Sequence, residues 1–463
     1  MSCAKARRSG REAIYAEATK ADSVANKGMS DPAPEGRCAV FRRRNHPVTL
    51  ALTILLAAVS GCANSNGASD QSAKSADQVE VFSWWQGPGE KEGYDALIAY
   101  FKDQNPGVDF INASVAGGAG SNARAVLASR MAANDPPDSY QVHAGQEEMS
   151  DVKAGKVQDL SYLFDRNGWR DKFPKAVMNA ITIGGKIYSV PVTIHRSNLL
   201  WYNVKAMRAA GIVKPPATWP EFMTIAAKLK AKKITPLAIG PEWTQKHLLE
   251  NVLLGELGVA KYSALWTGKA SWLGADVRAA VKVFSNVLAV SDVKTFDGDW
   301  QSALDKVIDG KAAYTVMGDW ADAYLSRAKG MTFGTDYEAV PSPGTDGVFN
   351  FLSDAFMLPT GAPHRAAAEK WLEACASVPG QEALSLQKRS LTARVDSDKT
   401  KYKDYLASAL AAWQNPATVV VGSATHGVLV DTVRSGEIDT ALSKFVGGGA
   451  IDQFLKSMDG IYA

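Results

Sequence analysis

The chain has 463 residues, which is too long for one compact core and indicates several domains or one large two-lobed unit. Hydrophobic residues make up 46% of it, which excludes a largely disordered chain. Ten of the 51 Lys and Arg and five of the 48 Asp and Glu lie in residues 1–61, so residues 62–463 carry 41 basic and 43 acidic residues. This balance, with its scattered basic residues, argues against a nucleic-acid-binding protein.

Residues 42–62 have the composition of an export signal. Three arginines at 42–44 precede an apolar run at 48–59, and Ser60-Gly61-Cys62 follows. The run is too short to span roughly 30 Å of hydrocarbon as a helix, so we expect no permanent transmembrane anchor. The sequence at 59–62 resembles a bacterial lipobox, in which Cys62 becomes the lipidated N-terminus. An ordinary cleavage site with a chance Cys is the alternative.

Residues 1–61 are therefore predicted to be a signal peptide and leader. The sequence leaves open whether translation starts at Met1 or Met29, and whether export follows the general or the twin-arginine route. Small polar residues dominate 62–78, which predicts a flexible tether behind the lipidated Cys. The expected location is extracytoplasmic, as a membrane-anchored lipoprotein on the cell surface or the periplasmic side.

Strands and helices alternate at the start of the body. The pattern predicts strands at 79–83, 108–115 and 139–142, with helices ending near Asp103 and spanning 121–133. Such alternation is typical of an α/β lobe with a mostly parallel sheet.

The second half of the body is predicted to begin near residues 191–197. Its clearest helix start is the capping box from Thr218 to Glu221. A strand is expected at 236–240, and residues 302–329 look helical with a break at Gly318. Cys375 lies on the apolar face of a predicted helix, where a buried inert thiol is expected. No Cys/His cluster has metal-ligand spacing, so we expect neither metal nor cofactor.

Two tryptophans mark the end of the first predicted strand. In open α/β sheets, ligands gather beyond the carboxyl ends of the strands, where Trp84 and Trp85 lie. Flat aromatic faces suit the C–H face of a pyranose ring. Glu90, five residues after Trp85, is placed to accept hydrogen bonds from sugar hydroxyls. A packing role for one or both tryptophans is the alternative.

Seven short segments are spread in order along the chain from Val79 to the C-terminus. They are 81–85 with Glu90, 141–145, 316–320, 341–345, 352–356, 393–398 and 425–427. Together they resemble the extracellular solute-binding proteins (family 1) of ABC sugar transporters, particularly the glucose/galactose/mannose-binding branch. The resemblance implies an α/β, two-lobed periplasmic-binding-protein-like fold of type II, with the ligand cleft between the lobes.

The expected lobes are discontinuous in sequence. Residues 79–190 are expected to form the first part of the N-terminal lobe and 191–310 the first part of the C-terminal lobe. Residues 311–350 are expected to return to the N-terminal lobe, and 351–463 to complete the C-terminal lobe.

The resemblance also implies a set of sugar contacts that combines aromatic, imidazole and charged side chains. The set is Trp84, Trp85, Glu90, His143, Trp300, Asp354, Lys388 and His426. Structural roles are alternatives for the two histidines, Trp300 and Asp354, and Asp319-Trp320 is interpreted as structural. The sequence leaves open whether Gln146, Glu147, Trp243 or Arg389 contacts the ligand.

The expected function is to bind a sugar, such as the monosaccharides glucose, galactose or mannose, outside the membrane. The monomeric, non-enzymatic protein would then deliver it to the permease subunits of an ABC importer. A secreted glycoside hydrolase is one alternative, because Glu90 and Asp354 could in principle pair across a cleft; the chain shows neither a nucleophile elbow nor a zinc motif. A carbohydrate-binding adhesive lipoprotein is another, although a hinge is useful only if a partner reads the closure.

Overall fold

The computed structural model describes residues 78–296 and 298–463. The predicted leader, the lipidation site Cys62 and the tether up to residue 77 lie outside this part of the chain. Within the described ranges, none of the helices combines the length and apolar character needed to cross a bilayer.

The first lobe is built on a five-stranded sheet with the order β2-β1-β3-β13-β6. Its strands are β1 (Gln78–Phe82), β2 (Asp109–Asn112), β3 (Ser139–His143), β6 (Ser189–Pro191) and β13 (Asp354–Met357). The strands β2, β1 and β3 are parallel, whereas β13 runs antiparallel to both β3 and β6. The predicted alternation of strands and helices is confirmed here, with the strand predicted at 108–115 shortened at both ends.

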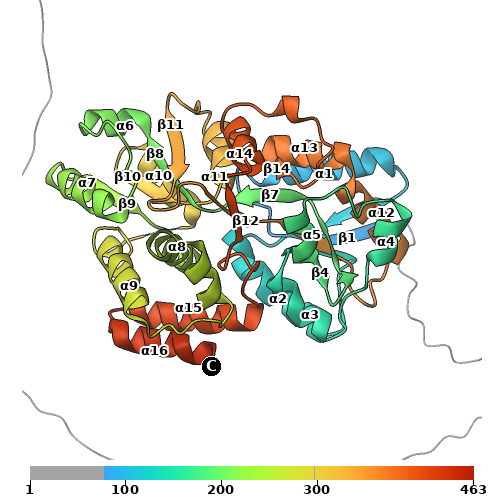
Figure 1. Ribbon diagram of the computed structural model, residues 1–463. Helices are drawn as coiled ribbons and strands as arrows, with labels where there is room; N and C mark the ends of the chain where they lie inside the picture. The colour runs from blue at the N-terminus through green and yellow to red at the C-terminus, as the bar shows by residue number, and fades with distance from the viewer. Residues whose placement is uncertain (1–77, 297) are drawn as a thin grey trace, which may run out of the picture. The chain divides into compact units, whose positions relative to one another are not determined.

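Helices and small elements cover this sheet. They are α1 (Lys91–Gln104), α2 (Ser121–Ala132), α3 (Met149–Lys153), α4 (Ser161–Arg166), α5 (Lys175–Ile181), α12 (Arg365–Ala376) and α13 (Val378–Lys388), with the β4–β5 hairpin (Thr182–Ile183, Lys186–Ile187). Helices α12 and α13 pack against α1 on one face (Figure 1). The buried rings of Tyr94 on α1 and Trp371 on α12 meet there at 6.2 Å between centroids. Cys375 on α12 is fully buried, as predicted.

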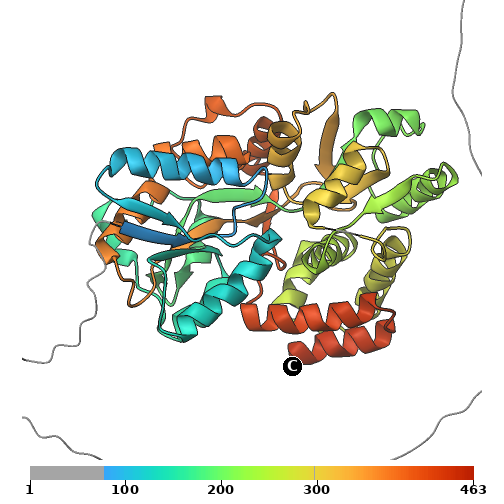
Figure 2. The same cartoon turned by 180° about the vertical axis from the view of Figure 1, so that it is seen from behind.

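The second lobe is built on a four-stranded sheet with the order β11-β8-β10-β9. Its strands are β8 (Leu199–Asn203), β9 (Thr235–Ala238), β10 (Ala312–Val316) and β11 (Tyr337–Pro341). Its helices are α6 (Val204–Ala209), α7 (Trp219–Ala231), α8 (Glu242–Trp266), α9 (Ala275–Leu288), α10 (Trp300–Ile308), α15 (Thr432–Val446) and α16 (Ile451–Ile461). The short α11 (Trp320–Ala323) follows β10 and packs against α13 of the first lobe. Helices α15 and α16 lie side by side in both views and pack against α8 and α9 (Figures 1 and 2).

The predicted capping box begins α7. The Thr218 hydroxyl accepts a hydrogen bond from the backbone N–H of Glu221 at 3.3 Å. The Glu221 carboxylate reaches back to the N–H of Ala217 at 2.8 Å, one residue before the expected position. Both bonds use N–H groups that lack a partner within the helix, which is why this motif starts helices.

Short strands form a third sheet where the chain passes between the lobes. Its order is β14 (Leu391–Thr392), β7 (Thr193–Arg196), β12 (Val348–Leu352) and β15 (Val419–Gly422), with α14 (Tyr405–Gln414) preceding β15. Along the chain, β7 connects β6 to β8, and β12 connects β11 to β13. Segments distant in sequence therefore meet at the junction of the lobes.

The strand pairing differs from the expected lobe boundaries. β10 and β11 pair with β8 in the second lobe, so residues 311–350 do not return to the first lobe. β13 pairs with β3 and β6, and α13 packs on α1, so the part of 351–463 up to about residue 392 belongs to the first lobe. The expectation of helix throughout 302–329 is also wrong, since 312–316 is a buried strand. A short apolar run cannot be assigned to helix or strand by periodicity alone, and sequence spacing does not reveal which strands pair.

Candidate functional site

The first lobe brings four of the predicted site residues to one edge of its sheet. Trp84 and Trp85 follow β1, and His143 ends β3. Asp354 begins β13 and lies directly opposite His143 in the strand register. Because β1 and β3 are parallel, their carboxyl ends meet at one edge, where ligands of α/β proteins gather.

The other predicted residues approach from helices and from the second lobe. Glu90 precedes α1 and Lys388 ends α13, two helices that pack together. Trp300 begins α10, where Asp299 accepts a hydrogen bond from its N–H. His426 lies in the loop between β15 and α15.

These elements surround a narrow cavity with about 20 Å³ of water-accessible volume. Its lining consists of Trp84, Trp85, Glu90, Ala119, His143, His195, Trp300, Trp320, Leu352, Asp354, Lys388 and His426. All eight residues predicted as sugar contacts are therefore brought together around one cavity.

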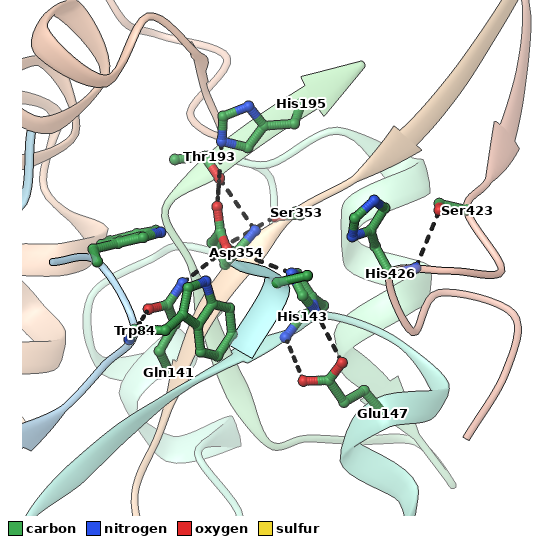
Figure 3. Close-up of polar contacts among 12 residues, drawn as sticks. Trp84, Gln141, His143, Glu147, Thr193, His195, Ser353, Asp354, Ser423 and His426 are labelled. Carbon is green, nitrogen blue, oxygen red and sulfur yellow. Dashed lines mark hydrogen bonds and ion pairs between the residues drawn. The ribbon is translucent and has the colours of Figure 1, made fainter. Parts of the chain in front are cut away.

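Asp354 is the centre of the polar network shown in Figure 3. Its carboxylate accepts hydrogen bonds from the amide of Gln141 at 2.9 Å and the hydroxyl of Thr193 at 2.8 Å. The ring Nε2 of His195 lies 3.3 Å from the same carboxylate. Burial alone would raise the pKa of Asp354, but His195 and the positive charge of Lys388 hold it well below its ordinary value. Asp354 is therefore a carboxylate that can accept hydrogen bonds from a ligand.

His195 on β7 connects Asp354 to a second carboxylate. Its Nδ1 is hydrogen bonded to Asp319, whose other oxygen accepts the backbone N–H of Arg196 at 2.9 Å. Burial lowers the pKa of His195, but the two carboxylates outweigh it and the pKa is raised overall. Asp319 is fully buried and fixes His195, which fits its interpretation as a structural residue.

Glu90 and Lys388 form a buried ion pair beside Trp85. The Lys388 ammonium lies 3.3 Å from the Glu90 carboxylate and 4.9 Å from the centre of the Trp85 ring. Burial raises the pKa of Glu90 and outweighs the opposing effect of Lys388. Trp85 also packs edge-on against Tyr94 and Phe356, so this tryptophan belongs to both the core and the cavity wall.

His143 is oriented by Glu147. The His143 Nδ1 donates to the Glu147 carboxylate at 2.9 Å, and the His143 backbone N–H donates to it at 3.2 Å. Burial would raise the pKa of Glu147, but His143 and Arg124 lower it to about 2. The ring of His143 also meets the ring of Trp84, with 5.0 Å between ring centroids.

The sequence does not decide whether four further residues contact the ligand, and none of the four lines the cavity. They are Gln146, Glu147, Trp243 and Arg389. Glu147 holds His143, and Arg389 is paired with Asp322 at 2.5 Å. Trp243 packs against His426 at 6.0 Å between centroids and lines an outer groove that also touches Ala119. Gln146 is exposed.

Sequence reasoning missed His195 and Trp320 as lining residues. Trp320 begins α11 next to Asp319, and its ring lies 5.8 Å from that of His195 and 5.1 Å from that of His426. The available signal for His195 was its place within residues 191–197, where the second half of the body is predicted to begin, because a segment that joins two lobes passes the cleft between them. Among the described residues, no group of three or more His, Cys, Asp or Glu is arranged to hold a metal ion.

Two α/β lobes joined by short crossing strands, with an aromatic and polar cavity at their junction, define a periplasmic-binding-protein-like fold. The sequence matches the bacterial extracellular solute-binding protein family over residues 76–382, and the chain belongs to this family.

Relatives and solved structures agree with this assignment. An uncharacterized ABC transporter extracellular-binding protein of Pyrococcus horikoshii is 29% identical over 398 residues, which cover 85% of this chain and 89% of the relative. A probable sugar-binding periplasmic protein of Rhizobium meliloti is 30% identical over 362 residues, covering 77% and 86%. Among solved structures, the bacterial solute receptor AcbH, described as preferring β-D-galactopyranose, superposes with a TM-score of 0.73 at 16% identity, covering 84% and 98%.

Proposed function

We propose that this protein binds a sugar, most simply a single hexose ring, outside the cytoplasm and delivers it to an ABC importer. The observation that carries the proposal is the composition of the cavity wall. Tryptophans offer flat faces to a sugar ring, while Asp354, Lys388 and the histidines offer charged or directional hydrogen-bonding groups. Few polar groups, held in place by neighbours, are typical of a small-molecule site.

The Rhizobium meliloti relative, described as a probable sugar-binding periplasmic protein, supports the ligand class. The eight predicted residues are proposed to be the sugar contacts, with His195 and Trp320 added to them.

Titration calorimetry with D-glucose, D-galactose, D-mannose, D-xylose and several disaccharides tests the proposal. We expect saturable binding of at least one monosaccharide and a rise in melting temperature. Ligand at a hundred times its dissociation constant stabilises the folded state by about 2.7 kcal/mol. Binding of disaccharides alone would contradict the single-ring proposal, and binding of no carbohydrate would contradict sugar binding itself.

Glycoside hydrolysis is the rival function, and one observation favours it. Both Glu90 and Asp354 line the cavity, and their pKa values move in opposite directions, as those of an acid and its partner carboxylate do. Against it, both carboxylates already have buried cationic neighbours. Chromatography of glycosides incubated with the protein separates the two: unchanged glycoside supports binding alone, and catalytic release of free sugar supports hydrolysis.

The membrane attachment is a further part of the proposal. Cys62 is proposed to carry lipid, which would hold the monomeric body at the outer face of the membrane beside the permease subunits. Two or more acyl chains anchor firmly, whereas a single chain gives marginal binding.

A further inference from the structure

Two hydrogen-bonded histidines, His247 and His426, connect the backbone at the junction of the lobes to the cavity. Ser197 follows β7, and its carbonyl oxygen lies 2.7 Å from Nε2 of His247 on α8. The other ring nitrogen of His247, Nδ1, lies 3.2 Å from Nε2 of His426. Both rings are buried, and only His426 lines the cavity.

The carbonyl of Ser197 determines the direction of both hydrogen bonds. A carbonyl oxygen can only accept, so His247 must carry its proton on Nε2. A neutral imidazole has a single N–H, which leaves Nδ1 of His247 as an acceptor. His426 must then donate from its own Nε2, and its Nδ1 is left with a bare lone pair.

The surroundings keep both rings neutral. Burial lowers the pKa of His247 and outweighs the opposing effect of Glu250 on the same helix. Burial also lowers the pKa of His426, and the neighbouring His247 and His143 lower it further. The remaining charged groups near His426 are Lys246 on α8 and Arg124 on α2, which act in the same direction, and Glu147, which is bound to His143.

Nδ1 of His426 is buried and has no hydrogen-bond partner among the described residues. A buried acceptor without a partner is costly, so a ligand that supplies a donor is favoured. The loop that carries His426 is held in place by Glu250, whose carboxylate accepts the backbone N–H groups of Ala424 and Thr425 at 2.9 and 3.1 Å. The acceptor therefore has a fixed position as well as a fixed tautomer.

We propose that His247 is a positioning residue that fixes His426 as a hydrogen-bond acceptor, so that the bound sugar must donate a hydroxyl proton to Nδ1 of His426. This inference rests on the proposed function for the identity of the ligand as a sugar. The direction of the hydrogen bond to the sugar rests on the two hydrogen-bonded histidines. The two histidines select against ligands that present a fluorine, an ether oxygen or a carbonyl oxygen to Nδ1 of His426, since none of these groups can donate a hydrogen bond.

The first test needs no sugar. Nitrogen-15 NMR of the histidine rings in the unliganded protein reports which ring nitrogen carries the proton. We expect both His247 and His426 to be protonated on Nε2 alone at neutral pH. A proton on Nδ1 of either ring overturns the inference, whatever the protein binds, so this result is independent of the proposed function.

The second test compares D-glucose and D-galactose with each of their singly deoxyfluorinated derivatives. For one hydroxyl position, replacement by fluorine should weaken binding about tenfold in the wild type, because the acceptor loses its donor. His247→Gln should keep this ratio, since a Gln amide can donate to Ser197 and accept from His426. His247→Leu frees the tautomer, and the ratio should fall to about twofold or less. An unchanged ratio in His247→Leu would overturn the positioning role.

A matched control addresses the loss of a buried histidine in general. His364 is also buried, and its Nδ1 is bonded to Asp138 at 2.8 Å in the first lobe. His364→Leu should lower the melting temperature and leave the fluorine ratio at its wild-type value. A changed ratio in this control would show that the ratio follows stability, and would count against the inference.

Discussion

The buried pair of Glu90 and Lys388 yields a prediction that needs no knowledge of the ligand. Lys388→Met removes the cation 3.3 Å from the Glu90 carboxylate and keeps most of the apolar volume of the side chain. Breaking a buried ion pair by removing one partner costs about 3–5 kcal/mol, because the remaining charge is left without compensation. We expect a loss of this size in the free energy of unfolding at pH 8.

When Glu90 binds a proton it no longer carries an unpaired charge. The loss in the free energy of unfolding therefore depends on pH. Burial already raises its pKa above the ordinary value of 4.5, and the absence of Lys388 raises it further. The folded variant then binds the proton more tightly than the unfolded chain does. Stability should therefore be near the wild-type value around pH 4.5 and fall as the pH rises from there through the folded-state pKa.

Guanidinium unfolding followed by tryptophan fluorescence at pH 5 and pH 8 measures both quantities. The double variant Glu90→Gln/Lys388→Met, which buries no isolated charge, should recover most of the loss at pH 8. Lys91→Met is the matched control, because its ion pair with Asp95 is exposed and worth at most about 1 kcal/mol. Equal losses at both pH values, with no recovery in the double variant, would refute the reasoning.

Three further predictions concern ligand binding, closure and anchoring. Asp354→Asn should weaken sugar binding by about 1.5–3 kcal/mol in calorimetry through the loss of a charged acceptor; wild-type affinity would contradict its role. Gly118→Ala should fold normally, yet its Cβ would lie 2.9 Å from both the Trp243 ring and the Asp299 carboxylate of the other lobe. Small-angle scattering should then show less contraction with sugar than in the wild type, and full contraction would refute the clash. Cys62→Ser should abolish metabolic labelling with palmitate, whereas continued labelling would exclude the lipobox.

Local signals in the sequence were sufficient for much of the first lobe. The strand at 139–143 and the Thr218 cap depend on neighbouring residues, so they could be read from short windows. The return of β13 to the first sheet depends on the pairing of Asp354 with His143, which are 211 positions apart. No short-range pattern contains that information, and the lobe boundaries drawn after residue 310 were therefore wrong.

The candidate site was likewise only partly predictable from the sequence. The eight predicted residues came from ordered resemblance, and they do surround one cavity. His195 and Trp320 were not predicted to line the cavity, because their position depends on how β7 and α11 pass the junction of the lobes. The function of His247 could not be predicted at all, since it arises from contacts with Ser197 and His426 on two other segments.

The cavity wall is divided unequally between the lobes. The first lobe contributes the ion pair of Glu90 and Lys388 together with Asp354, whereas Trp300 comes from the second lobe. Trp320 on α11 and His426 in the loop after β15 lie at the junction of the lobes. On the proposed contacts, an incoming sugar would make its charged hydrogen bonds to the first lobe, and the second lobe would add contacts on closing. The encounter rate would then depend on the first lobe, and the residence time on how long the second lobe stays closed. On this proposal, substitutions in the second lobe would change the lifetime of the complex without altering how the sugar is first recognised.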